Sequence, residues 1–221
     1  MENITFKQIR ANEEINFYIE KSDSVLGVLG FTEHSREHAS KVAVMAGKIL
    51  EELGYSEHEI ELARITGYMH DIGNCINRHD HAHSGGAMAF QILRSLGMSP
   101  EDTAIVISAI GNHDEKTGTA VDAISAALIL ADKTDVRRNR VRNKIKATFD
   151  IHDRVNYAAV SSKLNINMEK RIIHLEIKLD DKICTVMDYF EIFLQRMTMC
   201  KRAAEFFNMK FKLTANGSKV C

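Results

Sequence analysis

Residues 67–74 read GYMHDIGN, so that His70 and Asp71 stand side by side at the end of an apolar helical run. Upstream, Ser56 and Glu59 form a capping-box pattern, which predicts a helix that ends near Met69. An imidazole next to a carboxylate, where a helix should pack on the core, is either an accident of the surface or part of a metal site. The other helices of the chain distinguish these interpretations.

Residues 1 to about 150 are predicted to be mainly helical, because Pro100 is the only proline and the glycines stand at breaks between periodic segments. Apolar residues at helical spacing, with capping residues at the ends, predict helices over residues 36–53, 84–96, 99–110 and 121–131. The last of these can continue through the basic residues that follow it.

The periodicity changes after about residue 158. Residues 164–168 and 173–179 alternate between apolar and polar side chains, which predicts two strands joined by a tight connection. A long helix follows, and its predicted apolar stripe consists of Ile183, Met187, Phe190, Leu194 and Met197. Residues 211–213 predict a last short strand. The expected fold is mainly α, with a helical domain over residues 1–150 and a small α+β appendage of β-β-α-β order over residues 151–221.

The net charge of −1 hides an asymmetry along the chain. Residues 1–132 hold 10 Lys and Arg against 20 Asp and Glu, whereas residues 133–221 hold 19 against 10. Seven basic residues lie within 133–146. This run indicates either a solvated helix face or a phosphate-binding surface.

We expect no signal peptide and no membrane span, because the sequence has no apolar run of the required length. The cysteines lack C-x-x-C spacing, which favours reduced thiols in a cytoplasmic protein; they are Cys75, Cys184, Cys200 and Cys221. The strands of the appendage can pair with another chain, so a homodimer is one expected state.

Five ionisable residues lie on the apolar faces of predicted helices: His38, His70, Asp71, His113 and Asp132. A lone inward histidine is usually a hydrogen-bonded core residue, and a lone inward aspartate usually caps a neighbouring helix. Two buried carboxylates among three histidines need a shared partner, because burying an unpaired carboxylate is costly. A divalent cation supplies that partner, since His and Asp are common metal ligands.

The order and context of these residues resemble the HD-domain superfamily of metal-dependent phosphohydrolases. The motifs are EHASKVAVMA around His38, GYMHDIGN around His70 and Asp71, and ALILADKTDVRR around Asp132. The resemblance covers roughly residues 30–145 and implies an HD-domain helical bundle. A second His-Asp pair at residues 152–153 lacks such a context.

The resemblance also implies two metal positions. One ion would be held by His38, His70, Asp71 and Asp132. Asp71 would bridge to a second ion, held by His113 and one further histidine. The candidates for that histidine are His79, His81 and His83.

Family helices often place this ligand four residues before a small residue that opens the helix. Gly85 therefore selects His81, with His83 as the alternative and His79 as a loop residue.

The implied reaction is hydrolysis of a phosphoester or phosphoanhydride by metal-activated water, with His70 and Asp71 as the catalytic pair. Iron or manganese suits a mixed His and carboxylate ligand set, with zinc, magnesium and nickel as alternatives. The implied substrate is a phosphorylated small molecule, in first place a nucleotide. Lys133, Arg137 and Arg138 follow Asp132, where a continuing helix would let them contact its phosphates.

Departures from the family pattern leave alternatives open. Asn74 stands where many relatives have Lys, and Asn112 stands where the cyclic-dinucleotide branch has a second His. Both favour a nucleotide-binding sensor or scaffold with little turnover. Residues 115–119 lack the Gly-Tyr-Pro pattern of that branch, which argues against cyclic di-GMP hydrolysis. A third alternative is an RNA-binding protein that uses the basic C-terminal half, although the predicted strands lack aromatic residues at stacking positions.

Overall fold

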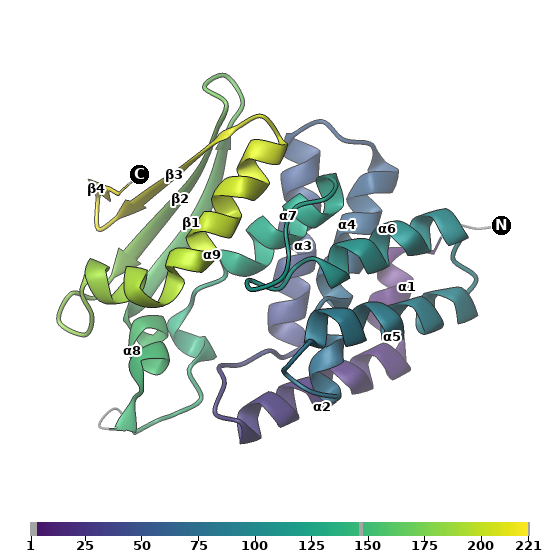
Figure 1. The fold of residues 1–221 in the computed structure, drawn as a ribbon, viewed down its shortest axis with the longest axis horizontal. Coiled ribbons are helices and arrows are strands. Elements are labelled where there is room, and N and C mark those ends of the chain that lie inside the picture. The colour runs from purple at the N-terminus through teal and green to yellow at the C-terminus, as the bar shows by residue number, and fades with distance from the viewer. Residues whose placement is uncertain (1–3, 146–147, 221) are drawn as a thin grey trace.

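The structure is a computed structural model that describes residues 4–145 and 148–220. Its α-helices are α1 (Phe6–Ala11), α2 (Glu13–Val28), α3 (Arg36–Glu52), α4 (Glu57–Met69), α5 (His81–Ser95), α6 (Pro100–Gly111), α7 (Ala123–Lys133), α8 (Ile151–Ala158) and α9 (Val186–Phe206). The 3₁₀ helices are η1 (Ile72–Cys75) and η2 (Arg138–Arg140), and the strands are β1 (Ala159–Asn167), β2 (Ile172–Leu179), β3 (Lys210–Ala215) and β4 (Ser218–Lys219). The prediction of a mainly α fold with a small C-terminal α+β part is confirmed. Figure 1 shows α1–α7 on one side of the molecule and the sheet on the other.

Helices α3, α4 and α7 pack against one another at the centre of the helical part. The predicted capping box of Ser56 and Glu59 opens α4. Gly67 on α4 allows the backbones of α3 and α4 to approach closely, because a Cβ at this position would lie 2.8 Å from Cα of Ala43. This approach brings the C-terminal end of α4 beside the first turn of α3, where the rings of His38 and His70 are 5.3 Å apart.

The predicted continuation of α7 into the basic residues is wrong, because the helix ends at Lys133. After this end, the carboxylate of Asp135 accepts hydrogen bonds from Nε and Nη2 of Arg137 at 2.6 and 3.1 Å. Residues two apart do not face each other on an α-helix, so this pair needs a non-helical backbone.

The sheet has the strand order β1-β2-β3-β4. β1 is antiparallel to β2, with Leu164 opposite Leu175, and β3 is parallel to β2, with Leu213 opposite Leu175. The predicted alternation in β2 is confirmed, because every second residue from Ile173 to Leu179 is buried. The structure adds α8 and the short β4 to the predicted β-β-α-β order.

Helix α9 connects β2 to β3 and packs on α7 and β3. The apolar stripe predicted for this helix is wrong in part, because Met187 and Leu194 are 78% and 60% exposed. The stripe that is buried consists of Tyr189, Phe193, Met197, Cys200 and Ala204. Both stripes have helical spacing, but the buried one continues to the last turn of the helix and so removes more apolar surface from water.

One cluster of buried apolar side chains extends from the helical part into the α+β part. The two parts are also joined by the hydroxyl of Ser162 on β1, which donates a hydrogen bond to the carbonyl oxygen of Thr134 at 2.7 Å. The predicted division into residues 1–150 and 151–221 stays a prediction.

Cys75, Cys184 and Cys200 are free thiols, whereas Cys221 and Lys146 lie outside the described residues. Within residues 4–145 and 148–220, no helix is both long enough and apolar enough to cross a membrane.

Candidate metal centre

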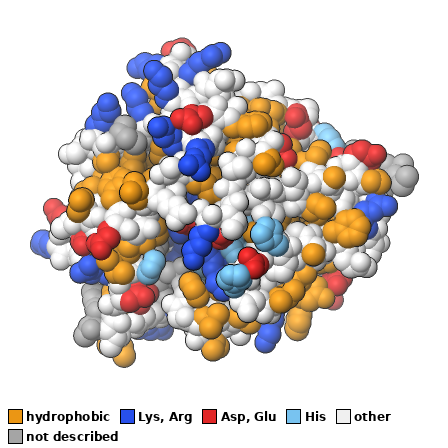
Figure 2. Space-filling view, viewed as in Figure 1, with side chains coloured by type: hydrophobic (Ala, Val, Ile, Leu, Met, Phe, Trp, Pro, Cys, Tyr) orange, Lys and Arg blue, Asp and Glu red, His pale blue; other side chains and the backbone are white. Residues whose placement is uncertain are grey.

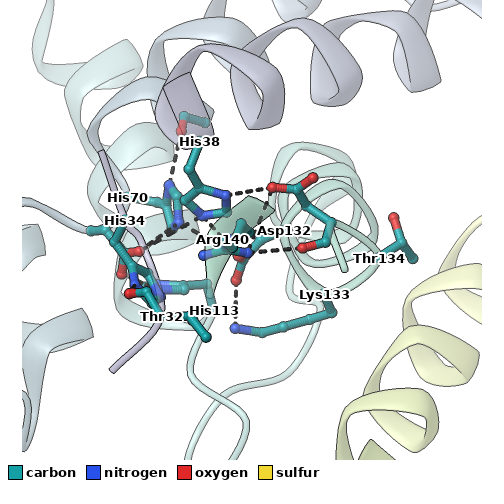
Figure 3. Close-up of polar contacts among 12 residues, drawn as sticks. Thr32, His34, His38, His70, His113, Asp132, Lys133, Thr134 and Arg140 are labelled. Atoms are coloured by element: carbon teal, nitrogen blue, oxygen red, sulfur yellow. Dashed lines mark hydrogen bonds and ion pairs between the residues drawn. The ribbon is translucent and has the colours of Figure 1, made fainter. Parts of the chain in front are cut away.

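Six side chains from five segments converge inside the helical part. They come from the first turn of α3 (His38), the junction of α4 and η1 (His70 and Asp71), the start of α5 (His81), the end of α6 (His113) and the last turn of α7 (Asp132). In three overlapping groups of these residues, the ligand-type atoms lie within 4.8 Å of one another. Figure 3 shows His38, His70, His113 and Asp132 in this arrangement. The structure thus brings together all six residues that the sequence predicts as metal ligands.

The four histidines present the same nitrogen to the centre. Nδ1 of His70, His81 and His113 lies 2.8, 3.1 and 2.6 Å from the backbone carbonyl oxygen three residues earlier. Nδ1 of His38 lies 2.8 Å from Oδ2 of Asp135. Because carbonyl and carboxylate oxygens only accept hydrogen bonds, each Nδ1 carries a proton. This leaves each Nε2 as the nitrogen that can bind a cation.

The two carboxylate oxygens of Asp71 face different histidines. Oδ2 lies 3.1 Å from Nε2 of His70 and 3.9 Å from Nε2 of His38. Oδ1 lies 3.5 Å from Nε2 of His81 and 3.7 Å from Nε2 of His113. Ligands about 2.0–2.2 Å from one ion lie roughly 3–3.6 Å from each other. The distances of 3.1 and 3.5 Å fall in this range and those of 3.7 and 3.9 Å are slightly longer, so each oxygen of Asp71 faces a position that is close to the size of an ion site.

Asp132 belongs to the first of these two groups. Its Oδ1 lies 3.4 Å from Nε2 of His38 and 3.7 Å from Nε2 of His70. Its Oδ2 forms an ion pair with Nζ of Lys133 at 2.5 Å. Asp132 therefore faces the histidines with one oxygen and a cation with the other.

The buried Nε2 atoms of His38 and His70 have no hydrogen-bond partner among the described residues. A buried polar nitrogen without a partner costs free energy, and the adjacent carboxylates of Asp71 and Asp132 favour positive charge at this point. A divalent cation satisfies both requirements, so the donor set fits a metal ion.

The same electrostatics appear in the pKa values of the centre. Burial opposes charge on His70, but the carboxylates of Asp71 and Asp132 raise its pKa to about 10. Burial raises the pKa of Asp71, but the neighbouring histidines, His70 first and then His113, outweigh this effect and hold that pKa well below its usual range. Burial lowers the pKa of His81 to about 3, despite the attraction of Asp71. His81 is therefore a neutral imidazole, the form that binds metals.

Of the three histidines considered for the further ligand position, His81 is the one that reaches the centre. Its Nε2 lies 3.1 Å from Nε2 of His113. The side chains of His79 and His83 are 85% and 61% exposed. Helix α5 begins at His81, three residues before the predicted start, which turns this side chain inward.

Three neighbours of the centre have no ligand role in the sequence prediction. Asp135 holds His38, as described above. The buried Asn74 donates from Nδ2 to Oδ1 of Asp71 at 2.8 Å. The ring of His34 packs edge-on against His38, with ring centres 5.5 Å apart. Asn74 and Asp135 have a signal in the sequence, since Asn74 closes the GYMHDIGN motif and Asp135 follows Asp132 by three residues.

A cleft of about 470 Å³ opens onto the centre and is lined by Asp71, His81, His113 and Asp132. Residues of α8 and α9 form part of its wall, among them Phe193. The cationic residues of the lining are Arg78, Lys116, Lys133, Arg140 and Arg196. Figure 2 shows Lys or Arg side chains next to histidines on this face of the molecule. The lining also holds Asp114, Glu115, Asp150 and Asp153, so the cleft carries charges of both signs beside the candidate ligands.

Of the three cations predicted to contact phosphate, Lys133 alone lines this cleft. Arg137 lines a different cavity. Arg138 donates from Nε to the carbonyl oxygen of Tyr157 at 2.5 Å, and its guanidinium lies over the Tyr157 ring. The structure does not bring Arg137 and Arg138 to the cleft.

Comparison with known protein families matches residues 36–192 to the family described as HD domain. The uncharacterized protein MJ1020 of Methanocaldococcus jannaschii is 25% identical over 201 residues, which cover 80% of this chain and 76% of that protein. Ribonuclease Y of Thermosipho melanesiensis is 28% identical over 155 residues, which cover 69% of this chain and 30% of the ribonuclease. Ribonuclease Y of Dehalococcoides mccartyi is 31% identical over 160 residues, which cover 66% of this chain and 27% of that ribonuclease.

The chain therefore spans less than a third of the length of the ribonucleases that it matches. The family match covers more than half of the chain and includes every candidate ligand from His38 to Asp132. The chain belongs to the HD domain family.

Proposed function

We propose that this protein is a metal-dependent enzyme that hydrolyses a phosphoester or phosphoanhydride, with a nucleotide as substrate. The observation that carries the proposal is the convergence of four imidazole Nε2 atoms and two aspartates, Asp71 and Asp132, at a cleft. Membership of the HD domain family supports the reaction class.

Two divalent ions complete the proposed site. The ligands of the first ion would be His38, His70, Asp71 and Asp132, and those of the second would be Asp71, His81 and His113. When bound, the ions would supply an activated water and neutralise charge on the phosphoryl group. Iron and manganese suit this mixed ligand set, with zinc, magnesium and nickel as alternatives.

The residues of the chain itself position these groups. Asp135 fixes the ring of His38, and Asn74 fixes the carboxylate of Asp71. Asp71 and its neighbour His70 lie where the two proposed ion positions meet, so catalysis should depend on them most. Lys133 lines the cleft with its ammonium group paired to Asp132. An ion bound by Asp132 would release this group to contact a phosphate oxygen.

Two features of the structure favour a small substrate. The cleft of about 470 Å³ has the size of a small-molecule site, and such sites run from about 300 to 1,000 Å³. The arginines of the basic run are not free for a substrate at the cleft: Arg137 lines a different cavity, and Arg138, Arg140 and Arg142 are engaged by Tyr157, Glu33 and Asp23. Few cations of this run remain for the many phosphate contacts of a long nucleic acid.

The similarity to ribonucleases Y favours a second candidate, the hydrolysis of RNA phosphodiesters. Nucleotide binding with little turnover, as in a sensor, is the third candidate. Phosphate contacts of Arg137 and Arg138, a homodimer and a cytoplasmic location all stay predictions.

The test is a metal analysis of the purified protein together with a substrate screen in Mn²⁺. The screen would contain nucleoside mono-, di- and triphosphates, a dinucleoside polyphosphate and a short single-stranded RNA. Hydrolysis of the nucleotides at a rate that increases with the metal content of the protein supports the proposal. Turnover of RNA alone would replace it with the second candidate, and tight nucleotide binding without turnover would replace it with the third.

A further inference from the structure

A second cavity, of about 590 Å³, lies between α3 and β1. Its apolar lining residues are Val44 and Met45 of α3, Ala131 of α7 and Leu164 of β1. Val44 is 57% exposed, so an apolar side chain of this wall is open to solvent. The cavity is large enough for a ligand of ordinary small-molecule size.

The rim of this cavity is positively charged. It holds four cationic residues, Arg10, Lys41, Lys48 and Arg137, against Glu37 and Asp135. Among the described residues, Lys41 and Lys48 form ion pairs with exposed acids one helical turn away. Such pairs contribute little free energy, so these lysines can exchange their partners for a bound anion.

The cavity shares a wall with the candidate metal centre. Arg137 lines the cavity and donates two hydrogen bonds to the carboxylate of Asp135, which also lines it. That carboxylate accepts the hydrogen bond from Nδ1 of His38. On the other side, Nη1 of Arg140, which lines the metal cleft, donates to the carbonyl oxygen of Asp135 at 2.8 Å. Asp135 therefore stands between the two cavities.

From this arrangement we infer that the second cavity binds an anion with an apolar body, whose anionic group contacts Arg137. The bound anion competes with Asp135 for the guanidinium group of Arg137. Without the two hydrogen bonds from Arg137, the carboxylate of Asp135 is no longer fixed in orientation. It then positions the ring of His38 less firmly, and the metal position of His38 binds its ion more weakly. Because coupling between two sites is reciprocal, the metal ion weakens binding of the anion by the same factor. The coupling rests on the proposed function of His38, whereas the binding of the anion does not.

The binding site is tested with 8-anilinonaphthalene-1-sulfonate, a fluorescent aromatic anion, titrated into metal-free protein. We expect saturable binding at one site per chain. Val44→Asp, which places negative charge on the wall, should weaken binding at least tenfold. Val28→Asp is the matched control, because Val28 is exposed on α2 and does not line the cavity. N-phenyl-1-naphthylamine has the same rings without the sulfonate and should bind at least tenfold more weakly. Equal binding by wild type and Val44→Asp, an equal loss in Val28→Asp, or equal affinity for the neutral compound would overturn the assignment.

The coupling is tested by the same titration on protein loaded with Mn²⁺. We expect a dissociation constant for the fluorescent anion that is roughly five times higher or more, which is the lower end of typical coupling between sites. Arg137→Gln should abolish the difference between loaded and metal-free protein. Equal dissociation constants for metal-loaded and metal-free wild-type protein would overturn the coupling, while the assignment of the anion site would stand. A protein that binds no Mn²⁺ would overturn the coupling together with the proposed function, while the metal-free titration still decides the site.

Discussion

His38 is held between two carboxylates that lie three residues apart at the end of α7. Its Nδ1 lies 2.8 Å from Oδ2 of Asp135, and its Nε2 lies 3.4 Å from Oδ1 of Asp132. One carboxylate fixes the tautomer and orientation of the ring, and the other shares the position proposed for the metal ion. The end of α7 therefore supplies one candidate ligand, Asp132, and also orients a second one, His38, through Asp135.

Asp135→Asn is expected to weaken metal binding without removing a ligand. The amide keeps the size of the side chain but loses the charge that holds the protonated Nδ1 of His38. Loss of such a contact typically lowers metal affinity roughly 10- to 100-fold. Competition with a chelator of known affinity measures the change. An unchanged affinity would show that Asp135 does not orient His38.

Asp71→Asn is expected to remove both metal and activity, because Asp71 lies between both groups of histidines. His79→Ala is the matched control, since the side chain of His79 is exposed and should affect neither property. Metal content by elemental analysis and hydrolysis of the best nucleotide from the screen check the contrast. Loss of metal in His79→Ala, with normal metal in His81→Ala, would mean that the wrong histidine was assigned.

The sequence predicted the candidate ligands because each stands in a local pattern. His38 lies on the apolar stripe of a helix, Asp132 lies on another, and the cap at Ser56 locates the helix that ends at His70. The structure brings these residues together without contradicting any of these patterns. The choice of His81 among three histidines depended on the spacing to Gly85, which is also a local feature.

The parts that the sequence did not predict depend on contacts between distant segments. The end of α7 is determined by Asp135, whose partners include His38, far away in the sequence. The buried stripe of α9 could not be chosen from spacing alone, because Met187 and Leu194 fit a helical stripe as well as Tyr189 and Phe193 do. The contact of Asn74 with Asp71 needed the actual path of η1.

Gly73→Ala is expected to destabilise the fold and displace His81. Gly73 packs on the start of α5, where an added Cβ would clash with the carbonyl oxygen of His81 and the amide nitrogen of Gly85. A clash with backbone cannot be relieved by a side-chain rotation, so we expect a loss of about 3 kcal/mol, the upper end of common overpacking costs.

The control for this substitution is Gly111→Ala. Gly111 lies on α6, and an added Cβ there would meet no atom within 4 Å. Alanine favours a helix over glycine by about 0.5–1 kcal/mol, so this variant should be at least as stable as the wild type. Chemical denaturation of both metal-free variants gives the two free energies of unfolding. A Gly73→Ala protein as stable as Gly111→Ala would contradict the packing described for η1 and α5.

Lys133→Ala is expected to lower kcat/KM while the protein keeps its metal. A charged hydrogen bond to a phosphate is worth about 1.5–3 kcal/mol, so its loss corresponds to a roughly ten- to hundredfold fall. Metal content should hold or rise, because Asp132 loses a competing cation. Arg138→Ala provides the comparison: an equal fall in this variant would support the phosphate contact predicted from the sequence, although Arg138 is engaged by Tyr157 in the structure.

The salt dependence of KM separates a nucleotide from RNA as the natural substrate. A protein that binds single-stranded nucleic acid through several phosphates releases counterions. The logarithm of its affinity then falls linearly with the logarithm of the salt concentration, with a slope of about −0.7 per phosphate contact. Lys133 and Arg140 are the basic-run residues that line the cleft, and Arg140 is engaged by the carbonyl oxygen of Glu33. Because the nearby arginines are engaged by protein acceptors, we expect only one or two phosphate contacts, and therefore a slope no steeper than about −1.5.

The measurement is KM for the best nucleotide and for a short RNA from about 50 to 200 mM salt, with 1/KM taken as the affinity. A slope of about −4 or steeper for RNA, with a lower KM than for any nucleotide, would identify a surface that contacts many phosphates and would favour the ribonuclease candidate. A shallow slope for both ligands, with faster turnover of the nucleotide, would match a small cleft whose phosphate contacts are Lys133 and the metal ions.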